Sequence, residues 1–505
     1  MSETPAYLRR SLALLGWIQS AQPKAMVTLD SIALGSWTDV APRWRRQGTR
    51  IRLQLHPRDR NMAFWVSSVQ PAPWGADIKV WDRSRPPAEM RVIWRDLPEP
   101  SRLSRGSMLK AVRAWAQRML PGCQIRSENQ TPDRAHSLSG TYLRLRLRRG
   151  KEDHLLLACG DMDVEEKAHA ILTQALLWLA YLHDQGVIRG APTIHLLIPA
   201  GHAAVLCHRA RLINRKQARI GVWEYTERAP QQWETRKPPI PPTPVEDRDF
   251  RWPVLGPFRW SPMLERVVGL APDAIQRYPR FQDYDSLRLW GLEFARVAGR
   301  DRDRVSYGVG LQTELTEDNF GDLRALVEEI LYYRRPDSPA PHHPYYRMQS
   351  ERWLECLLLT DIANLFPELV PGSVYPQIPV YLGKVPGRVD ILGADREGNL
   401  VVMELKVSED PNMPLQSLDY WGRVIGHNLN GDFERRGYFA GQRLSRARPK
   451  IYLVSPLFSF HDSLERVLRY LDPKLEVSKI GINEDWRCGA KILRRSNCRC
   501  GELPS

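Results

Sequence analysis

Two carboxylates and a lysine interrupt a pair of otherwise apolar, strand-like segments. Asp390 lies in the segment GRVDIL, and Glu404 and Lys406 lie in the segment LVVMELK. The turn ADREGN between the segments contains Gly398, which favours a hairpin. Because strand side chains alternate, Glu404 and Lys406 share one face, and hairpin pairing brings Asp390 beside them. We therefore expect two carboxylates and an ammonium at one end of a sheet.

This set of side chains is suited to a divalent cation. Two ionised carboxylates that lie close together repel each other, and a cation relieves that repulsion. Mg²⁺ prefers hard oxygen ligands and takes one or two protein carboxylates, which leaves positions for water and phosphate oxygens. The pattern predicts a Mg²⁺ site, with Mn²⁺ as the alternative ion, suited to phosphodiester cleavage. An exposed hairpin with ordinary surface charge is the competing interpretation.

The two segments also carry a family resemblance. GRVDIL…NLVVMELK resembles the PD-(D/E)XK nuclease superfamily, in branches whose motif reads G-R-(I/V)-D…E-L-K. The resemblance covers residues 348–482 and implies a restriction-endonuclease-like core, with a mixed central sheet flanked by helices. It implies that Asp390 and Glu404 bind the metal, together with the carbonyl of Leu405. Lys406 would be the motif lysine, which orients the attacking water or offsets charge on phosphorus.

The resemblance extends to the helices on either side of the motif. The preceding helix in this family usually lends an acidic residue, and SERWLECLLL offers Glu351 and Glu355, of which Glu355 is preferred. On the following helix, Gln416 and Tyr420 lie four residues apart and therefore on one face. They would assist at the scissile phosphate or hold the site together. Val389 stands where the name-giving motif has proline.

The order of expected elements predicts an α/β protein with an internal repeat. A helix, a charged hairpin, a helix and an apolar strand ending in proline occur twice, which suggests a degenerate copy before the nuclease-like one. The segment SLRLWGLEFARV, residues 286–297, is expected to form one strand. The expected organisation is residues 1–104 (β-rich), 105–230 (α/β, degenerate repeat), 231–344 (proline-rich linkers and an intervening α/β segment), 345–487 (nuclease-like) and 488–505 (basic tail with cysteines).

The first copy is expected to lack the metal site. Where the second copy has its motif glutamate and lysine, the first offers Ala158 or Cys159, followed by Gly160 or Asp161. No strand aspartate matches the first motif carboxylate. This copy would then serve as a scaffold, a DNA-positioning surface or a dimer-like partner.

Two basic stretches are candidate contacts for nucleic acid. Arg144, Arg146 and Arg148 alternate with leucines, as a phosphate track or a solvated strand face would. A second stretch follows the Gln/Tyr helix and includes Tyr438 and Phe439, which could stack on unpaired bases. Its cations, which could equally decorate a soluble loop, are Arg435, Arg436, Arg443, Arg446, Arg448 and Lys450.

Composition narrows the class of protein. The 73 Lys and Arg exceed the 58 Asp and Glu by 15, and this basic balance favours a polyanionic partner, nucleic acid first and an acidic membrane surface second. No secretory signal is recognised, and the most apolar helix, residues 170–182, is too short for a bilayer, so no membrane association is expected. Seven cysteines without a CxxC pair favour a reducing cytoplasm. The C-x-C spacing of Cys498 and Cys500 suits neither an iron–sulfur cluster nor zinc well.

These observations predict a Mg²⁺-dependent endonuclease that hydrolyses DNA, in restriction, phage defence or repair. A non-catalytic nucleic-acid-binding protein with the same fold and an RNA-directed nuclease are the alternatives. No Walker A motif is present, so an ATP-driven partner would be a separate chain. A homodimer stays open.

Overall fold

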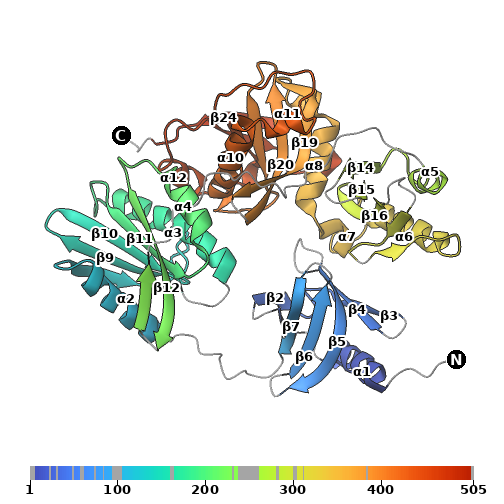
Figure 1. The fold of residues 1–505 in the computed structure, drawn as a ribbon, viewed down its shortest axis with the longest axis horizontal. Coiled ribbons are helices and arrows are strands. Elements are labelled where there is room, and N and C mark those ends of the chain that lie inside the picture. The colour runs from blue at the N-terminus through green and yellow to red at the C-terminus, as the bar shows by residue number, and fades with distance from the viewer. Residues whose placement is uncertain are drawn as a thin grey trace. The chain divides into compact units, whose positions relative to one another are not determined.

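The computed structural model is mixed α/β and divides into two units (Figure 1). The first unit contains Met1–Pro100 and Arg251–Leu357, and the second contains Ser101–Phe250 and Leu358–Ser505. Most of the first proline-rich stretch, 237–260, lies outside the described residues. The structure describes residues 6–21, 24–29, 32–47, 50–56, 62–72, 75–82, 85–93, 105–159, 164–229, 232–236, 261–279, 284–298, 304–310, 312–382 and 385–501. No helix in these ranges is long and apolar enough to cross a membrane.

The first unit begins with a helix packed on an antiparallel sheet. The strands lie in the order β2-β1-β7-β6-β5-β4-β3. Alternating apolar residues such as Leu53 and Ile78 meet Leu15 and Ile18 of the helix in one buried core. The elements are α1 (Ala6–Ala21), β1 (Met26–Leu29), β2 (Ile32–Ser36), β3 (Arg43–Gln47), β4 (Arg50–Leu55), β5 (Met62–Ala72), β6 (Gly75–Asp82) and β7 (Arg85–Ile93).

The rest of the first unit is a second antiparallel sheet with helices. The predicted single strand over residues 286–297 is wrong, because Trp290 and Gly291 both have positive φ and turn the chain into a hairpin. A side chain at Gly291 would collide with the backbone of Arg352. The elements are α5 (Pro262–Val268), β14 (Ile275–Pro279), β15 (Tyr284–Leu289), β16 (Leu292–Ala298), β17 (Arg304–Tyr307), β18 (Thr313–Glu314), α6 (Phe320–Tyr333), α7 (Pro344–Arg347) and α8 (Ser350–Thr360), whose last residues belong to the second unit.

The second unit contains two six-stranded sheets. The first is built from α2 (Arg105–Met119), β8 (Gln124–Asn129), β9 (Leu143–Arg149), β10 (Glu152–Ala158), α3 (Val164–Asp184), β11 (Thr193–Pro199), α4 (Ala203–Ala210), β12 (Arg219–Ala229) and β13 (Gln232–Arg236). The second is built from α9 (Ile362–Leu365), β19 (Leu369–Leu382), β20 (Val385–Asp395), β21 (Leu400–Leu405), α10 (Met413–Leu429), α11 (Asp432–Arg435), β22 (Lys450–Pro456), α12 (Leu464–Leu468), β23 (Val477–Ile482) and β24 (Ile492–Cys498), with short 3₁₀ turns at Leu457–Ser459 and Trp486–Cys488.

The two sheets of the second unit have the same topology. Their strand orders are β8-β9-β10-β11-β12-β13 and β19-β20-β21-β22-β23-β24. In each, the first three strands pair antiparallel, the next two join in parallel, and the last pairs antiparallel again. Helix α3 therefore occupies the same place in the chain order as α10, and α4 the same place as α12.

The helices of the two copies pack against each other in reciprocal pairs (Figure 1). Helix α3 of the first copy contacts α12 of the second, and α4 of the first contacts α10 of the second. The loops that follow α4 and α12 also meet, through the bridge between Ile213 and Leu471. One apolar core, which includes Leu176 and Leu418, spans both copies. This is the reciprocal arrangement of a two-fold dimer, here within one chain.

The hairpin turn between β20 and β21 requires glycine at position 398. Gly398 has φ of +80°, and a Cβ there would collide with the carbonyl oxygen of Arg443. We expect Gly398→Ala to lower the free energy of unfolding by about 2 kcal/mol, measured as a lower denaturant midpoint. Gly372→Ala is the matched control, because Gly372 has space for a Cβ and no positive φ. Equal stability of the two variants would contradict this account.

Candidate metal and catalytic site

Strand pairing places the two motif carboxylates next to each other. The β20–β21 ladder runs antiparallel, and its last pair toward this end is Ile391 with Met403. The next pair in the same register is Asp390 with Glu404. Residues directly opposite in an antiparallel pair point to the same face of the sheet. Both carboxylates therefore lie on one face, at the end of β21.

Asp390 is held by the strands on both sides. Its Oδ2 accepts a hydrogen bond from the backbone N–H of Leu405 at 3.0 Å. On the other side, Nε2 of Gln377 lies 3.3 Å from its Oδ1. Gln377 adopts φ of 58°, which is uncommon outside glycine, and lies between two regular rungs of the β19–β20 ladder. Nothing in the sequence pattern pointed to this residue.

Glu404 and Lys406 form an ion pair beneath the surface. Glu404 is 2% exposed, and the Nζ of Lys406 lies 3.1 Å from its Oε1. A third carboxylate lies nearby: the Oδ2 of Asp410, four residues after Lys406, is 4.0 Å from the same Nζ. The lysine is thus held over the carboxylate that shares its strand face. A partly buried ammonium in this position compensates negative charge more strongly than it could in bulk water.

Helix α10 presents Gln416 and Tyr420 toward the same site. Burial raises the pKa of Tyr420, and the nearby charges of Glu404 and Asp390 raise it further, while Lys406 lowers it. Its phenol is therefore protonated at neutral pH and can donate a hydrogen bond. The Oε1 of Gln416 is buried and has no hydrogen-bond partner among the described residues. Of these two predicted site residues, Tyr420 lies near the charges of Glu404, Asp390 and Lys406, while Gln416 lies one helical turn before it.

A buried arginine that the sequence pattern did not single out lies beside Tyr420. Arg423 is 3% exposed, and its Nε has no hydrogen-bond partner in the described part of the chain. Its guanidinium occupies the space that a side chain at Gly387 would need, and the Tyr420 ring borders the same space. The glycine of the G-R-V-D motif thus makes room for this cation. The signal in the sequence was the helical spacing from Gln416 to Tyr420 to Arg423.

A buried ion pair beside Tyr420 and Arg423 ties α10 to the first copy. Arg209 of α4 forms two hydrogen bonds with Asp419, at 2.9 and 2.7 Å, and both side chains are buried. The neighbouring His208 donates from Nε2 to the carbonyl oxygen of Leu418 at 3.2 Å. It fills the space above Gly422, where a Cβ would collide with its ring. Burial lowers the pKa of His208.

Glu355 forms ion pairs with two arginines of the first unit. It is 1% exposed, with Nη1 of Arg352 at 2.8 Å from Oε2 and Nη1 of Arg288 at 3.4 Å from Oε1. Both cations compensate its negative charge. Its role as a further metal ligand stays a prediction.

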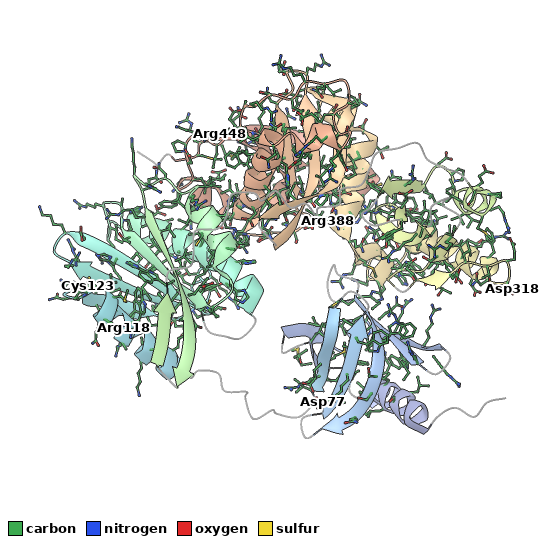
Figure 2. The ribbon with its side chains drawn as sticks, in the orientation of Figure 1. Asp77, Arg118, Cys123, Asp318, Arg388 and Arg448 are labelled. Atoms are coloured by element: carbon green, nitrogen blue, oxygen red, sulfur yellow. The ribbon has the colours of Figure 1, made fainter. Side chains whose placement is uncertain are left out.

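The basic loop lies at the other end of β21 from the carboxylates. Ser445 donates its backbone N–H to Gly398 in the hairpin turn, and Lys450 pairs with Asp395 at 3.0 Å. Figure 2 shows Arg448, in this loop, well apart from Arg388, which precedes Asp390 by two residues. The loop cations make the following contacts: Arg435 with Asp432, Arg446 with the carbonyl of Asn428, and Arg448 with Asp472 at 3.7 Å, while Arg443 is exposed and Arg436 is half-buried.

The expected base-stacking role of Tyr438 and Phe439 is wrong. Both side chains are buried, and they pack with Tyr375 in an aromatic cluster. The expected role in a phosphate track on β9 is also wrong for Arg144. Arg144 is buried and donates to the carbonyls of Ser139 and Thr131, so it is a structural cation rather than a surface one.

The first copy has other side chains at the positions of Asp390, Glu404 and Lys406. Equivalent backbone bonds run from Cys159 to Leu197 and from Lys406 to Val454, which aligns Cys159 with Lys406. Two residues earlier, Leu157 then aligns with Glu404, and its strand partner Arg144 aligns with Asp390. The sequence-based alignment was shifted by one or two residues on β10, because the hairpins differ in length. In the register that the structure shows, none of the three aligned residues of the first copy is a carboxylate.

The donor set fits a hard divalent cation with few protein ligands. Within the described ranges, no group of three or more His, Cys, Asp or Glu side chains lies close enough to hold a metal. Two carboxylates suffice for Mg²⁺ when water and substrate oxygens complete its shell. Asp390 and Glu404 supply two such groups on one face.

Comparison of the sequence with models of protein families and with curated proteins finds no match.

We expect the Arg209–Asp419 pair to be a major stabilising contact of the second unit. Arg209→Ala leaves a buried carboxylate without its cation and should cost about 3–5 kcal/mol in the free energy of unfolding. The denaturant midpoint measures the loss, and Arg209→Ala with Asp419→Ala should recover part of it. Arg149, in an exposed pair with Glu152, is the matched control and should change little. Similar effects at the two arginines would contradict the assignment.

Proposed function

We propose that the chain is a Mg²⁺-dependent endonuclease of the PD-(D/E)XK type that hydrolyses DNA phosphodiester bonds. The observation that carries the proposal is the β20–β21 register, whose extension by one pair beyond Ile391 and Met403 brings Asp390 and Glu404 together on one sheet face, with the Nζ of Lys406 3.1 Å from Glu404. The second sheet, with three antiparallel strands followed by a helix and a parallel strand, agrees with a restriction-endonuclease-like core. The net charge of +15 supports a polyanionic substrate.

Asp390 and Glu404 would hold the metal. The N–H of Leu405 points toward Asp390, and in a strand the carbonyl of a residue points to the same side as its N–H. The Leu405 carbonyl is therefore available as a backbone ligand. A bound Mg²⁺ would supply Lewis-acid polarisation of the phosphate and stabilisation of the leaving oxygen.

The remaining residues would act on charge and position. Lys406 offsets the negative charge that develops at phosphorus and orients the attacking water from the same face. Tyr420, which stays protonated, donates a hydrogen bond to a phosphate oxygen. Arg423 adds a buried cation behind it, where water screens its field weakly. Gln416 offers an amide for a further contact.

We expect Asp390→Asn, Glu404→Gln and Lys406→Ala each to lower the Mg²⁺-dependent cleavage rate by about 100-fold or more. Removing a ligand carboxylate or the motif cation removes interactions made only as charge develops. The measurement is cleavage of supercoiled plasmid, branched DNA and single-stranded DNA, with an excess of EDTA as the metal-free arm. Glu397→Gln removes an exposed carboxylate from the same hairpin and should leave the rate unchanged.

Three outcomes would decide against the proposal. Binding of DNA without cleavage in Mg²⁺ or Mn²⁺ would favour the non-catalytic alternative. Cleavage of RNA but not DNA would favour the RNA-directed alternative. Cleavage that survives Asp390→Asn and Glu404→Gln would place the chemistry elsewhere.

One site per chain has a consequence for the product. The first copy carries Leu157, Cys159 and Arg144 in place of the trio, so each chain would cut one strand per encounter. We expect limiting protein to convert supercoiled plasmid to the open circular form before linear DNA accumulates. The gel time course measures this order. Linear DNA as the first product at limiting protein would show instead that two sites act together.

A further inference from the structure

The N-terminal sheet carries aromatic and basic side chains together on the face that points away from α1. On β4, Ile51 and Leu53 point into the core with α1, so Arg50 and Arg52 point to the other face. Across the sheet, Arg52 lies opposite Trp65, and Trp65 lies opposite Trp81. Arg52, Trp65 and Trp81 thus form a row over three neighbouring strands.

The rings and the guanidinium groups of this row are arranged in layers. The two indoles stack with centroids 6.1 Å apart and an interplanar angle of 27°. The guanidinium of Arg52 lies 4.8 Å from the centroid of Trp65, and that of Arg50 lies 5.5 Å from Trp81 and 5.9 Å from Trp65. Such contacts hold the cations above the indoles.

The row is partly accessible, and the cations around it outnumber the carboxylates of Asp77 and Glu89, which share this face and pair with Arg91. Both indoles are half-buried, and Arg50 and Lys79 are exposed on the same face. On β3, Arg45 lies opposite Arg52 and continues the row, with its side chain bonded to Thr313 at 2.6 Å. Half-buried indoles beside cations suit a ligand that is flat, apolar on its faces and negatively charged along its length.

We propose that this face binds single-stranded nucleic acid, with bases on Trp65 and Trp81 and phosphates on Arg50, Arg52 and Lys79. Unpaired bases stack on aromatic side chains regardless of sequence, and basic residues follow the backbone. A duplex does not fit this chemistry, because its bases are stacked on each other and cannot lie on a flat sheet. The site is separate from the carboxylates of β20 and β21 and does not depend on cleavage.

The test is binding of the full chain to labelled oligothymidylate and oligouridylate in EDTA, followed by fluorescence anisotropy. EDTA prevents metal-dependent cleavage, so this test is independent of the proposed chemistry. We expect Trp65→Ala and Trp81→Ala each to raise Kd about tenfold, the loss of one stacked base. Trp65→Phe, which keeps a ring, should recover most of the affinity.

Variants of the basic residues test the phosphate contacts without removing a ring. Each of Arg50→Ala and Lys79→Ala should reduce the slope of log K against log salt by about 0.7. Tyr332→Ala is the matched control, because Tyr332 of α6 has an exposed ring with the guanidinium of Arg335 above it. It should bind like the native protein.

Three results would overturn the proposal. The first is equal affinity for a duplex of the same length, since charge alone would then explain binding. The second is native affinity in the variant with both Trp65→Ala and Trp81→Ala. The third is no binding of either oligonucleotide at low salt. Preference for the thymidylate or the uridylate, which differ in the sugar and in the C5-methyl group of the base, supports the proposal in either case.

Discussion

The packed layer of helices between the two α/β copies is the constraint on which the candidate site depends. Helix α10 contacts α4 of the first copy through the buried pair Arg209–Asp419, and Tyr420, the residue after Asp419, lies near the carboxylates of the motif strands. A helix that is fixed on one side by a buried ion pair and an apolar core has little freedom on the other. The first copy, although it lacks the carboxylates, therefore sets the position of groups that face them.

The site itself follows from strand alternation at the end of a sheet. Asp390 and Glu404 come from neighbouring antiparallel strands, and Lys406 comes two residues after Glu404, so all three share one face. Their charges are partly compensated before any ligand binds, by the Leu405 N–H and by the lysine. Tyr420 and Arg423 add a neutral donor and a buried cation from the helix. This combination favours a substrate that brings both a cation and a phosphate.

The sequence was sufficient for the trio because its information is local. Alternation over a few residues and one glycine turn determine which side chains share a face, and Gly398 does adopt the required positive φ. The sequence was insufficient where packing between distant segments determines the path of the chain or the burial of a side chain. Residues 286–297 satisfy a strand pattern, yet the chain turns back at Trp290. Tyr438 and Phe439 lie among arginines in the sequence, yet they are buried because Tyr375 from a distant strand packs on them.

The central claim is that the carboxylates at positions 390 and 404 share one divalent cation. The most direct measurement is anomalous diffraction from crystals of the full chain soaked in Mn²⁺, which scatters anomalously and replaces Mg²⁺ at oxygen sites. The account predicts an anomalous peak within about 2.0–2.5 Å of a carboxylate oxygen from each residue. Carboxylates that point to opposite faces of the sheet, or a Mn²⁺ peak elsewhere with none between these two residues, would contradict it.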